Sequence, residues 1–256
     1  MKIRVGILGA CGRMGNEVIK AVHETKDCIL VGACDVVNIG KKIEDVIITD
    51  NFNSIIDTKP DVIVDFAKPF SMENAKLMIE KGICPVIGTT GQTDEEIKKL
   101  EKLSEKYGTS AMIIPNFAIG AVLMMKYAGE IAKYMPEAEI IEFHHDKKLD
   151  SPSGTAIKTA KIIRDARNSA NIVPSIPLGS PDDPARGEHS IDNIHIHSVR
   201  LPGYVAHQEV IFGGQGQTLS IRHDSIDRTS FMPGVLLCIR KAITIKKFIY
   251  GLDKLL

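Results

Sequence analysis

The sequence predicts an α/β protein in which a doubly wound parallel sheet accompanies an α+β domain with an open mixed sheet. Through the first half, short and continuously apolar strands alternate with helices, the pattern of a parallel sheet covered on both faces. After Asn116 the alternation ends, and three strand-like runs follow one another with short turns, which indicates antiparallel pairing. The length of 256 residues, 44% of them hydrophobic and 25% charged, is sufficient for two domains.

The elements of the first half are marked by apolar runs and by helix caps. Thr93 and Glu96 have the spacing of a capping box, which predicts a helix that begins there and runs to about Tyr107. Further helices are predicted over 14–23 and 71–81, and strands over 3–8, 28–34, 61–66, 84–87 and 111–114.

The second half begins with a predicted apolar helix over 117–134. A strand that ends near His144 follows, and then a helix that starts around Ser153. The three later strands are predicted over 193–199, 204–212 and 217–222, with a glycine-rich turn between the last two.

Two other segments of the second half are marked by proline, glycine and serine. Prolines and glycines recur through 171–190, which predicts a long loop. Ser230 is placed to cap a last helix that reaches Ile245, and Pro233 is tolerated in its first turn.

Composition excludes several classes of protein. The 32 basic and 32 acidic residues cancel, which argues against a nucleic-acid partner or an acidic membrane surface. The longest apolar run, 117–125, is too short to span a bilayer, and the start of the chain has no signal-peptide pattern. Five cysteines without a C-x-x-C pair argue against a disulfide framework or a structural zinc site and fit a cytoplasmic protein.

A glycine-rich loop joins the first strand to the first helix. Its sequence, GACGRMG over 9–15, has the spacing G-x-x-G-x-x-G, which lets backbone N–H groups approach a pyrophosphate at the start of a helix. Asp35 stands twenty residues beyond Gly15, at the end of the second strand, where a carboxylate would accept hydrogen bonds from a ribose. Together they predict a dinucleotide site; the alternative is a tight turn with an ordinary surface aspartate.

The residues after Asp35 bear on which dinucleotide is bound. A 2′-phosphate would be repelled by this carboxylate and needs a basic partner, but Val36 and Val37 follow directly. Only Arg13, Lys41 and Lys42 lie nearby in the sequence. The hypothesis is therefore that NADH is used at least as well as NADPH.

Two more turns are placed to line the nicotinamide side of that site. Gly88-Thr89-Thr90-Gly91 follows one predicted strand, and Asn116 and Phe117 follow the next. In open α/β sheets, ligands bind beyond the carboxyl ends of the strands; the alternative for each turn is a plain loop.

The densest group of reactive side chains lies over 142–156. His144 and His145 at a strand end point to opposite sides, and a histidine can donate a proton near neutral pH. Lys148 supplies a positive charge, and Ser153-Gly154-Thr155 open a helix whose N–H groups favour an anion. This combination predicts a carboxylate clamp; the alternative is a helix cap beside surface histidines and a solvated lysine.

Other candidate groups are weaker. His195 and His197 share one strand face and could ligate a metal, but no third ligand stands at a convincing spacing, so no metal is predicted. His207 and His223 are expected to be structural. Arg228, before the last helix, could hold a second anionic group or form a surface ion pair.

Five segments, in order, resemble the dihydrodipicolinate reductase family, also called 4-hydroxy-tetrahydrodipicolinate reductase. They are GACGRMG at 9–15, DFAKP at 65–69, GTTG at 88–91, PNFAIG at 115–120 and EFHHDKKLDSPSGTA at 142–156. The last is the most specific, and the resemblance extends over essentially the whole chain.

The resemblance implies NADH- or NADPH-dependent reduction of a cyclic imine dicarboxylate on the way to diaminopimelate and lysine. It implies a Rossmann-type dinucleotide-binding domain of residues 1–116 and 229–256 and a substrate-binding domain, 117–228, whose sheet builds a homotetramer. His144 would be the general acid and Lys148 a second proton donor or charge partner. Substrate would be bound by His145, Ser153, Gly154, Thr155 and Arg228. The residues that would line the cofactor site are Gly9, Ala10, Cys11, Gly12, Arg13, Met14, Asp35, Gly88, Thr89, Thr90, Ile114, Pro115, Asn116 and Phe117.

The residue after the ribose-binding acid departs from the family pattern. Many members have a basic residue there, whereas this chain has Val36. Two other functions stay open on the residues alone: another two-domain dehydrogenase of amino-acid metabolism, and a non-catalytic NAD(H)-sensing module. A sensor would not need the paired histidines and the clamp, and a self-acylating semialdehyde enzyme would need an activated cysteine.

Overall fold

The computed structural model describes residues 2–173, 191 and 193–256 and divides into two compact units. Unit 1 contains both ends of the chain, Met1–Ile119 and Phe231–Leu256, and unit 2 is the intervening Gly120–Ser230. The sequence placed the two boundaries after 116 and after 228. Most of the predicted loop at 171–190 lies outside the described residues.

Unit 1 is built on an eight-stranded sheet in the order β12-β7-β6-β5-β1-β2-β4-β3. All neighbouring strands run parallel except β3 and β4, which form an antiparallel edge. The strands are β1 (Ile3–Leu8), β2 (Cys28–Cys34), β3 (Lys42–Ile43), β4 (Val46–Thr49), β5 (Val62–Asp65), β6 (Cys84–Ile87), β7 (Ala111–Ile113) and β12 (Phe248–Tyr250).

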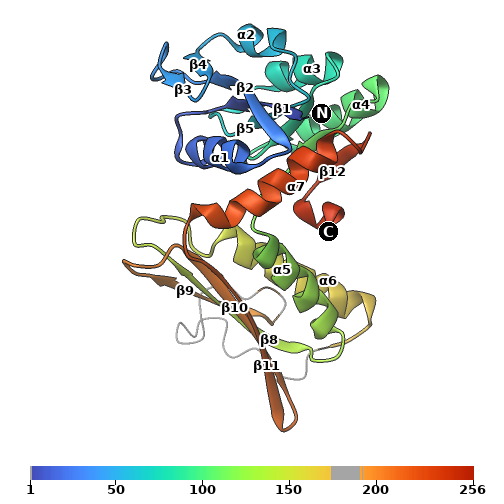
Figure 1. Ribbon diagram of the computed structural model, residues 1–256. Helices are drawn as coiled ribbons and strands as arrows, with labels where there is room; N and C mark the ends of the chain where they lie inside the picture. The colour runs from blue at the N-terminus through green and yellow to red at the C-terminus, as the bar shows by residue number, and fades with distance from the viewer. Residues whose placement is uncertain (1, 174–190, 192) are drawn as a thin grey trace. The chain divides into compact units, whose positions relative to one another are not determined.

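Helices cover this sheet on both faces (Figure 1), which confirms the predicted doubly wound class. Helices α1 and α7 contact each other on one face, and α3 and α4 contact each other on the opposite face, together with α2. The helices are α1 (Arg13–Glu24), α2 (Phe52–Asp57), α3 (Met72–Glu80), α4 (Asp94–Tyr107) and α7 (Met232–Ala242).

The core of unit 1 follows from the apolar runs of its strands. Strands β5 and β6 are buried at every position, as expected where helices cover both faces of a sheet. The predicted capping box at the start of α4 is confirmed, since Thr93 Oγ1 accepts from the Glu96 N–H and Glu96 Oε2 accepts from the Thr93 N–H. Gly108, with φ of 61°, ends the helix in the left-handed conformation that favours glycine.

The chain reverses direction across the sheet at β1. From β1 it proceeds to β2 and β4 on one side and then returns to β5 on the other side. Ligands of open α/β sheets bind beyond the carboxyl ends of the strands at such a reversal. Gly9 follows β1 and Phe66 follows β5, so the glycine loop lies at this position.

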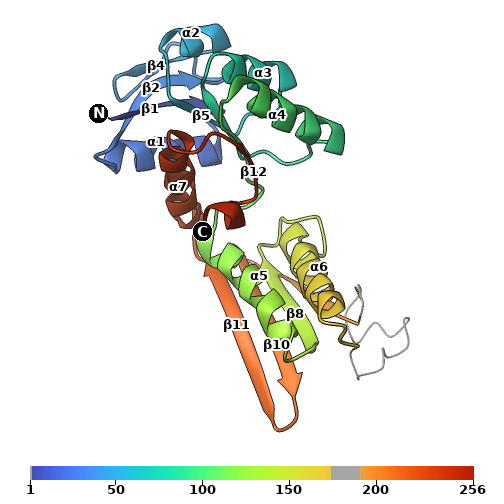
Figure 2. The same cartoon turned by 90° about the vertical axis from the view of Figure 1, so that its right-hand side faces the viewer.

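Unit 2 consists of a four-stranded mixed sheet with helices α5 and α6 on one face (Figures 1 and 2). The strand order is β11-β10-β8-β9, in which β8 and β9 are parallel and the other pairs are antiparallel. Its elements are α5 (Ile119–Ala132), β8 (Glu137–His144), α6 (Gly154–Ser169), β9 (His195–Arg200), β10 (Ala206–Gly214) and β11 (Gln217–Ser225).

Several elements differ from the sequence predictions. The strands β3, β4 and β12 and the helix α2 were not predicted. Strands as short as β5, β6 and β7 were found only because they are continuously buried, mostly apolar runs, whereas β3, β4 and β12 each include exposed positions. Of the three later strands, β10 and β11 pair antiparallel as expected, whereas β9 pairs with β8, in parallel, and not with β10. The predicted cap at Ser230 is wrong: a 3-10 helix over Arg228–Phe231 precedes α7, and the Ser230 hydroxyl donates to the Asp227 carbonyl instead.

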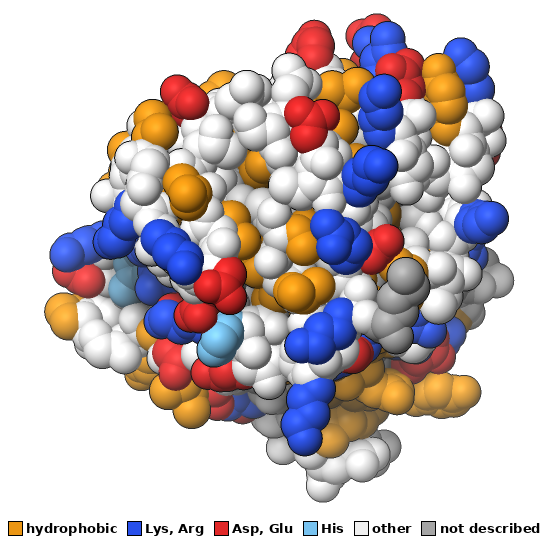
Figure 3. Space-filling model, turned by 45° about the horizontal axis from the view of Figure 1, so that its top comes forward, with side chains coloured by type: hydrophobic (Ala, Val, Ile, Leu, Met, Phe, Trp, Pro, Cys, Tyr) orange, Lys and Arg blue, Asp and Glu red, His pale blue; other side chains and the backbone are white. Residues whose placement is uncertain are grey.

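The surface agrees with the even charge balance. On the face shown in Figure 3, Lys and Arg side chains and Asp and Glu side chains both occur, with hydrophobic side chains among them. Within the described part of the chain, no helix is long and apolar enough to cross a membrane.

Candidate active site

A pocket of about 400 Å³ lies in unit 1 at the carboxyl ends of the central strands. The loops that follow β1, β5, β6 and β7 form it, and the residue before α7 completes it. Its lining consists of Gly9, Gly12, Arg13, Met14, Gly15, Phe66, Lys68, Gly88, Thr89, Thr90, Pro115, Asn116, Phe117 and Phe231.

The glycine loop brings helix α1 directly against the strand-end backbone. A Cβ atom on Gly15 would lie 2.1 Å from the Gly9 carbonyl oxygen, so only glycine fits there. Gly9 has φ of +74°, and a Cβ on it would lie 2.8 Å from the Phe66 carbonyl carbon. These contacts leave no room for side chains between the loop and the sheet.

The start of α1 is open to an anion. Its N-cap, Gly12, has no side chain to accept from the first N–H groups, and the first turn contains no acidic residue. The free N–H groups and the positive end of the helix dipole therefore favour a phosphate. This loop fits the pyrophosphate of a dinucleotide cofactor.

Asp35 is held at the end of β2 by the same loop. Its Oδ2 accepts from the Cys11 N–H at 2.8 Å, and its Oδ1 accepts from the Val37 N–H at 3.2 Å. These bonds fix the carboxylate next to the glycine loop, where its remaining lone pairs can accept from ribose hydroxyls. Val36 is 83% exposed, which leaves an apolar rather than a basic surface beside the carboxylate.

The pocket contains most, but not all, of the predicted cofactor residues. Four predicted residues do not line it: Ala10, Cys11, Asp35 and Ile114. Four lining residues were missed: Gly15, Phe66, Lys68 and Phe231. Phe66 and Lys68 belong to the DFAKP segment, which could have indicated them, whereas Phe231 is brought to the pocket by the C-terminal part of unit 1.

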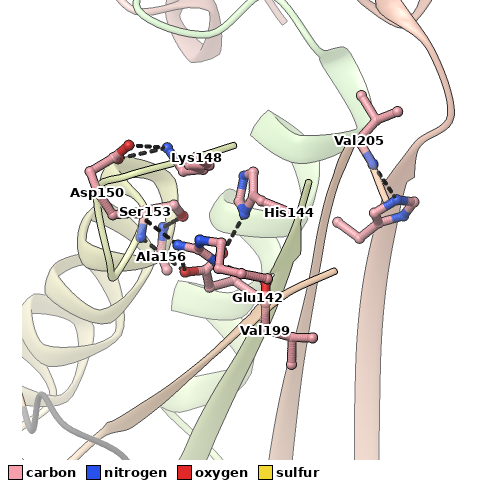
Figure 4. A network of polar contacts seen from close by, with 10 residues as sticks. Glu142, His144, Lys148, Asp150, Ser153, Ala156, Val199 and Val205 are labelled. Atoms are coloured by element: carbon pink, nitrogen blue, oxygen red, sulfur yellow. Dashed lines mark hydrogen bonds and ion pairs between the residues drawn. The ribbon is translucent and has the colours of Figure 1, made fainter. Parts of the chain in front are cut away.

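The second candidate site lies in unit 2, where β8 ends and α6 begins. Figure 4 shows Glu142 near the end of β8, His144 above it, and Ser153 and Ala156 at the start of α6 beside it. Glu142 Oε2 contacts His144 Nδ1, and Glu142 Oε1 accepts from the Ser153 N–H at 3.2 Å. The predicted residues His144 and Ser153 are therefore joined through a carboxylate between them.

Arg200, the last residue of β9, completes this group. Its Nη2 donates to Glu142 Oε1 at 2.7 Å, and its Nη1 donates to Glu142 Oε2 at 2.9 Å. Burial alone would raise the pKa of Glu142, but the hydrogen bonds from His144 and Arg200 outweigh it and lower the pKa to about 2. The carboxylate is therefore ionised at neutral pH although its side chain is fully buried.

Lys148, the second catalytic candidate, and His145, predicted to bind substrate, differ in their partners. Lys148 Nζ binds both carboxylate oxygens of Asp150, at 2.6 and 2.7 Å, so its charge is paired rather than solvated. The pKa of Asp150 is lowered by this contact. His145 follows β8 and is partly buried, and its carbonyl accepts from the Lys148 N–H in a turn.

The predicted anion site at the start of α6 is partly occupied by the protein itself. Ser153 is the N-cap, and its hydroxyl accepts from the Ala156 N–H at 3.2 Å. The N–H groups of Gly154 and Thr155 open the helix, where no preceding turn can accept from them. Arg228 is partly buried in the 3-10 helix over Arg228–Phe231.

Two of the other histidines contact carboxylates. His197 Nε2 contacts Glu139 Oε2 at 2.8 Å, and His207 Nδ1 contacts Asp224 Oδ1 at 2.6 Å. His195 is buried, which differs from the half-exposed position expected of it. Among the residues that the structure describes, no group of three or more potential ligands could hold a metal ion.

Two family models match successive parts of the chain. One, described as dihydrodipicolinate reductase, N-terminus, matches residues 3–117, and one described as dihydrodipicolinate reductase, C-terminus, matches residues 120–256. The chain belongs to the dihydrodipicolinate reductase family. The family predicted from the sequence is thereby confirmed, as is the prediction of an NAD(P)H-dependent oxidoreductase.

Individual family members are similar over their full length. A 4-hydroxy-tetrahydrodipicolinate reductase of Syntrophomonas wolfei is 46% identical over 100% of this chain and 99% of its own, and one of Geobacillus thermodenitrificans is 47% identical over 100% of both. The solved structure of dipicolinate-bound dihydrodipicolinate reductase from Paenisporosarcina sp. TG-14 is 44% identical, covers 100% of both chains and has a TM-score of 0.90. An amine dehydrogenase of Mycobacterium smegmatis, 14% identical with a TM-score of 0.67, shares the fold.

Proposed function

We propose that this chain reduces 4-hydroxy-tetrahydrodipicolinate, a cyclic imine dicarboxylate, with His144 as the proton donor. The observation that carries the proposal is the group at the end of β8, in which an ionised buried carboxylate joins the His144 ring to the start of α6. Lys148 is linked to this group through Asp150 and Arg200. The full-length relatives named above are called reductases of this compound. The related structure binds dipicolinate, a planar dicarboxylate, which supports a site for two carboxylates.

The chemistry divides between the cofactor and the protein. The ring becomes a conjugated imine once its hydroxyl has left as water. When bound, a reduced nicotinamide would then supply a hydride for the unsaturated ring carbon, which leaves an enamine. His144 then donates a proton to the neighbouring ring carbon. Lys148 and the N–H groups of Gly154 and Thr155 bind the carboxylates, so that binding energy is used to orient the ring.

The decisive experiment is an absorbance assay of NADH oxidation with the purified chain and the freshly formed cyclic imine. We expect steady oxidation that depends on the imine. NADH binding without turnover would favour the sensing module, and turnover only with another amino-acid precursor would favour a different dehydrogenase.

The cofactor preference is a separate prediction. The exposed Val36 and Val37 after Asp35 present no positive charge to a 2′-phosphate, and Lys42 is paired with Asp45 at 3.3 Å. We expect kcat/KM with NADH to be at least equal to that with NADPH. Steady-state kinetics with both cofactors measure this ratio, and a hundredfold preference for NADPH would contradict the prediction.

Replacing Lys148 by alanine is expected to weaken substrate binding and slow the reaction. Loss of one charge-assisted hydrogen bond to a carboxylate is worth about 1.5–3 kcal/mol, which corresponds to a roughly 10- to 100-fold fall in kcat/KM. Both KM and kcat should change, while the NADH dissociation constant should not. Lys147→Ala is the matched control, since Lys147 is exposed and adjacent, and equal kinetics of the two variants would remove Lys148 from the site.

We also propose that unit 2 mediates a homotetramer and that the protein is cytoplasmic. Residues 217–220 of β11 are exposed, which supports an assembly through this sheet, and light scattering on the purified chain measures its mass. All five cysteines are free thiols, which supports a reducing compartment.

A further inference from the structure

We propose that Glu142 and Arg200 are a positioning pair for the His144 ring. The pair holds the ring so that its Nδ1–H donates a hydrogen bond to Glu142 and its Nε2 is available to the substrate. The effect of the pair on the reaction rests on the proposed function. Its effect on the His144 ring does not, because the ring is held in the same way in the free protein. Neither residue is expected to touch substrate.

The first step is the charge of Glu142. Its side chain is fully buried, and four donors surround it: two N–H groups of Arg200, the Ser153 N–H and the His144 ring. The Arg200 contact is bidentate, with one nitrogen for each carboxylate oxygen, the geometry that most favours an ionised carboxylate. A buried carboxylate with this set of donors remains ionised when the protein is folded.

The second step concerns the proton on His144. An ionised carboxylate can only accept hydrogen bonds, so the ring nitrogen that contacts Glu142 must carry a proton. In the neutral ring, Nδ1 is then the protonated nitrogen and Nε2 is the acceptor. When the ring is charged, the proton that can leave is the one on Nε2, and this fixes the atom that delivers it.

The third step links Arg200 to the loop that contains Lys148. The same Nη2 that binds Glu142 also donates to the Asp150 carbonyl at 2.8 Å, and the Asp150 carboxylate binds Lys148. Arg200 therefore positions His144 through Glu142 and the Lys148 loop through Asp150. On the other side of β8, the residue of β10 opposite Glu142 is the uncharged Gln208.

Register explains why Arg200 reaches this group. β8 and β9 are parallel, with His144 opposite Arg200 and Glu142 opposite Ser198. The Arg200 side chain therefore starts level with His144 and reaches back along the strand to Glu142. The residues are 58 positions apart in the sequence, so the pair exists only in the folded sheet.

The test replaces Glu142 by glutamine, which preserves shape but presents an amide N–H₂ in place of one oxygen. In either orientation the amide opposes one nitrogen of Arg200. In place of Oε2 it also donates to His144 Nδ1 and reverses the tautomer, whereas in place of Oε1 it would oppose a second donor, the Ser153 N–H, so the first orientation is favoured. In ¹⁵N NMR spectra of the free protein, we expect neutral His144 to be protonated on Nδ1 in the wild type and on Nε2 in the variant. We expect kcat to fall about 100-fold, with NADH binding unchanged.

Glu139→Gln is the matched control, because Glu139 contacts His197 from the same strand and lies outside the proposed site. Its kcat should equal that of the wild type. Glu142→Asp, which keeps the charge, should recover part of the activity lost in Glu142→Gln. Arg200→Lys, which keeps the charge but loses the bidentate contact, should lower kcat about tenfold, and it is the second variant if Glu142→Gln does not fold.

Three results would overturn the proposal. One is a wild-type His144 that is protonated on Nε2 when neutral. Another is a Glu142→Gln kcat equal to that of Glu139→Gln, and the third is equal activity of the Asp and Gln variants at position 142. The NMR result does not depend on turnover, so the expected tautomer without reduction of the imine would contradict the proposed function and leave the positioning pair intact.

Discussion

Replacing His144 by glutamine is expected to lower kcat about 10²–10⁴-fold, the range that general-acid catalysis usually supplies. Glutamine has a similar length and can still contact Glu142, but its amide cannot donate a proton to carbon at neutral pH. The pocket of unit 1 does not include position 144, so the dissociation constant of NADH should not change. Stopped-flow kinetics with the cyclic imine and fluorescence titration with NADH measure the two effects.

The control for this variant is His197→Gln. His197 also contacts a glutamate of β8, Glu139, but it is not part of the group around Glu142. Its loss should leave kcat unchanged. If His144→Gln retained near full kcat, another group would have to donate the proton, and the role proposed for His144 would fail.

Replacing Gly15 by alanine is expected to abolish tight NADH binding and to destabilise unit 1. The added Cβ would lie 2.1 Å from the Gly9 carbonyl oxygen and 2.8 Å from Ala10 Cα, which are backbone atoms with no rotamer to change. The loop or helix α1 must therefore move, and overpacking of this kind costs about 1–3 kcal/mol or more. A shift of the helix also removes its N–H groups from the phosphate.

Calorimetric titration with NADH and a thermal melt measure these two consequences. We expect the NADH dissociation constant to increase at least roughly tenfold, which corresponds to a loss of about 1.4 kcal/mol of binding free energy. We also expect a lower Tm. Gly213→Ala is the control in unit 2, since a Cβ there would have its nearest neighbour at 4.0 Å. Normal NADH affinity in Gly15→Ala would show that the close approach of helix and strand is not required for binding.

The parts of the fold predicted from the sequence are those with local signals. The strand, glycine loop and helix at the start of the chain follow from a continuous apolar run and from the spacing of the glycines. Strand β12 has only three residues and depends on its pairing with β7, more than a hundred positions earlier. The local pattern of apolar residues does not predict which distant strand a segment pairs with, because the contacts that stabilise the pair are not local in the sequence.

The same distinction applies to the candidate site. His144 and Lys148 are four residues apart and were found by their chemistry. Glu142 belongs to the same segment, but its importance depends on its burial, which the sequence does not show. Arg200 had no local signal at all, since only the parallel register of β8 and β9 brings it to His144. The sequence thus indicated the side chains proposed to react and not the contacts around them.

Unit 1 is assembled from both ends of the chain, and this has a consequence during synthesis. Phe231, α7 and β12 all belong to the last twenty-six residues, Phe231–Leu256, and they leave the ribosome after every residue of unit 2. The eight-stranded sheet then lacks its β12 edge, and α1 lacks its partner α7, until these residues have been made. A nascent chain can therefore complete unit 2 first, and the pocket of unit 1 is finished only after Phe231 and the residues that follow it have left the ribosome.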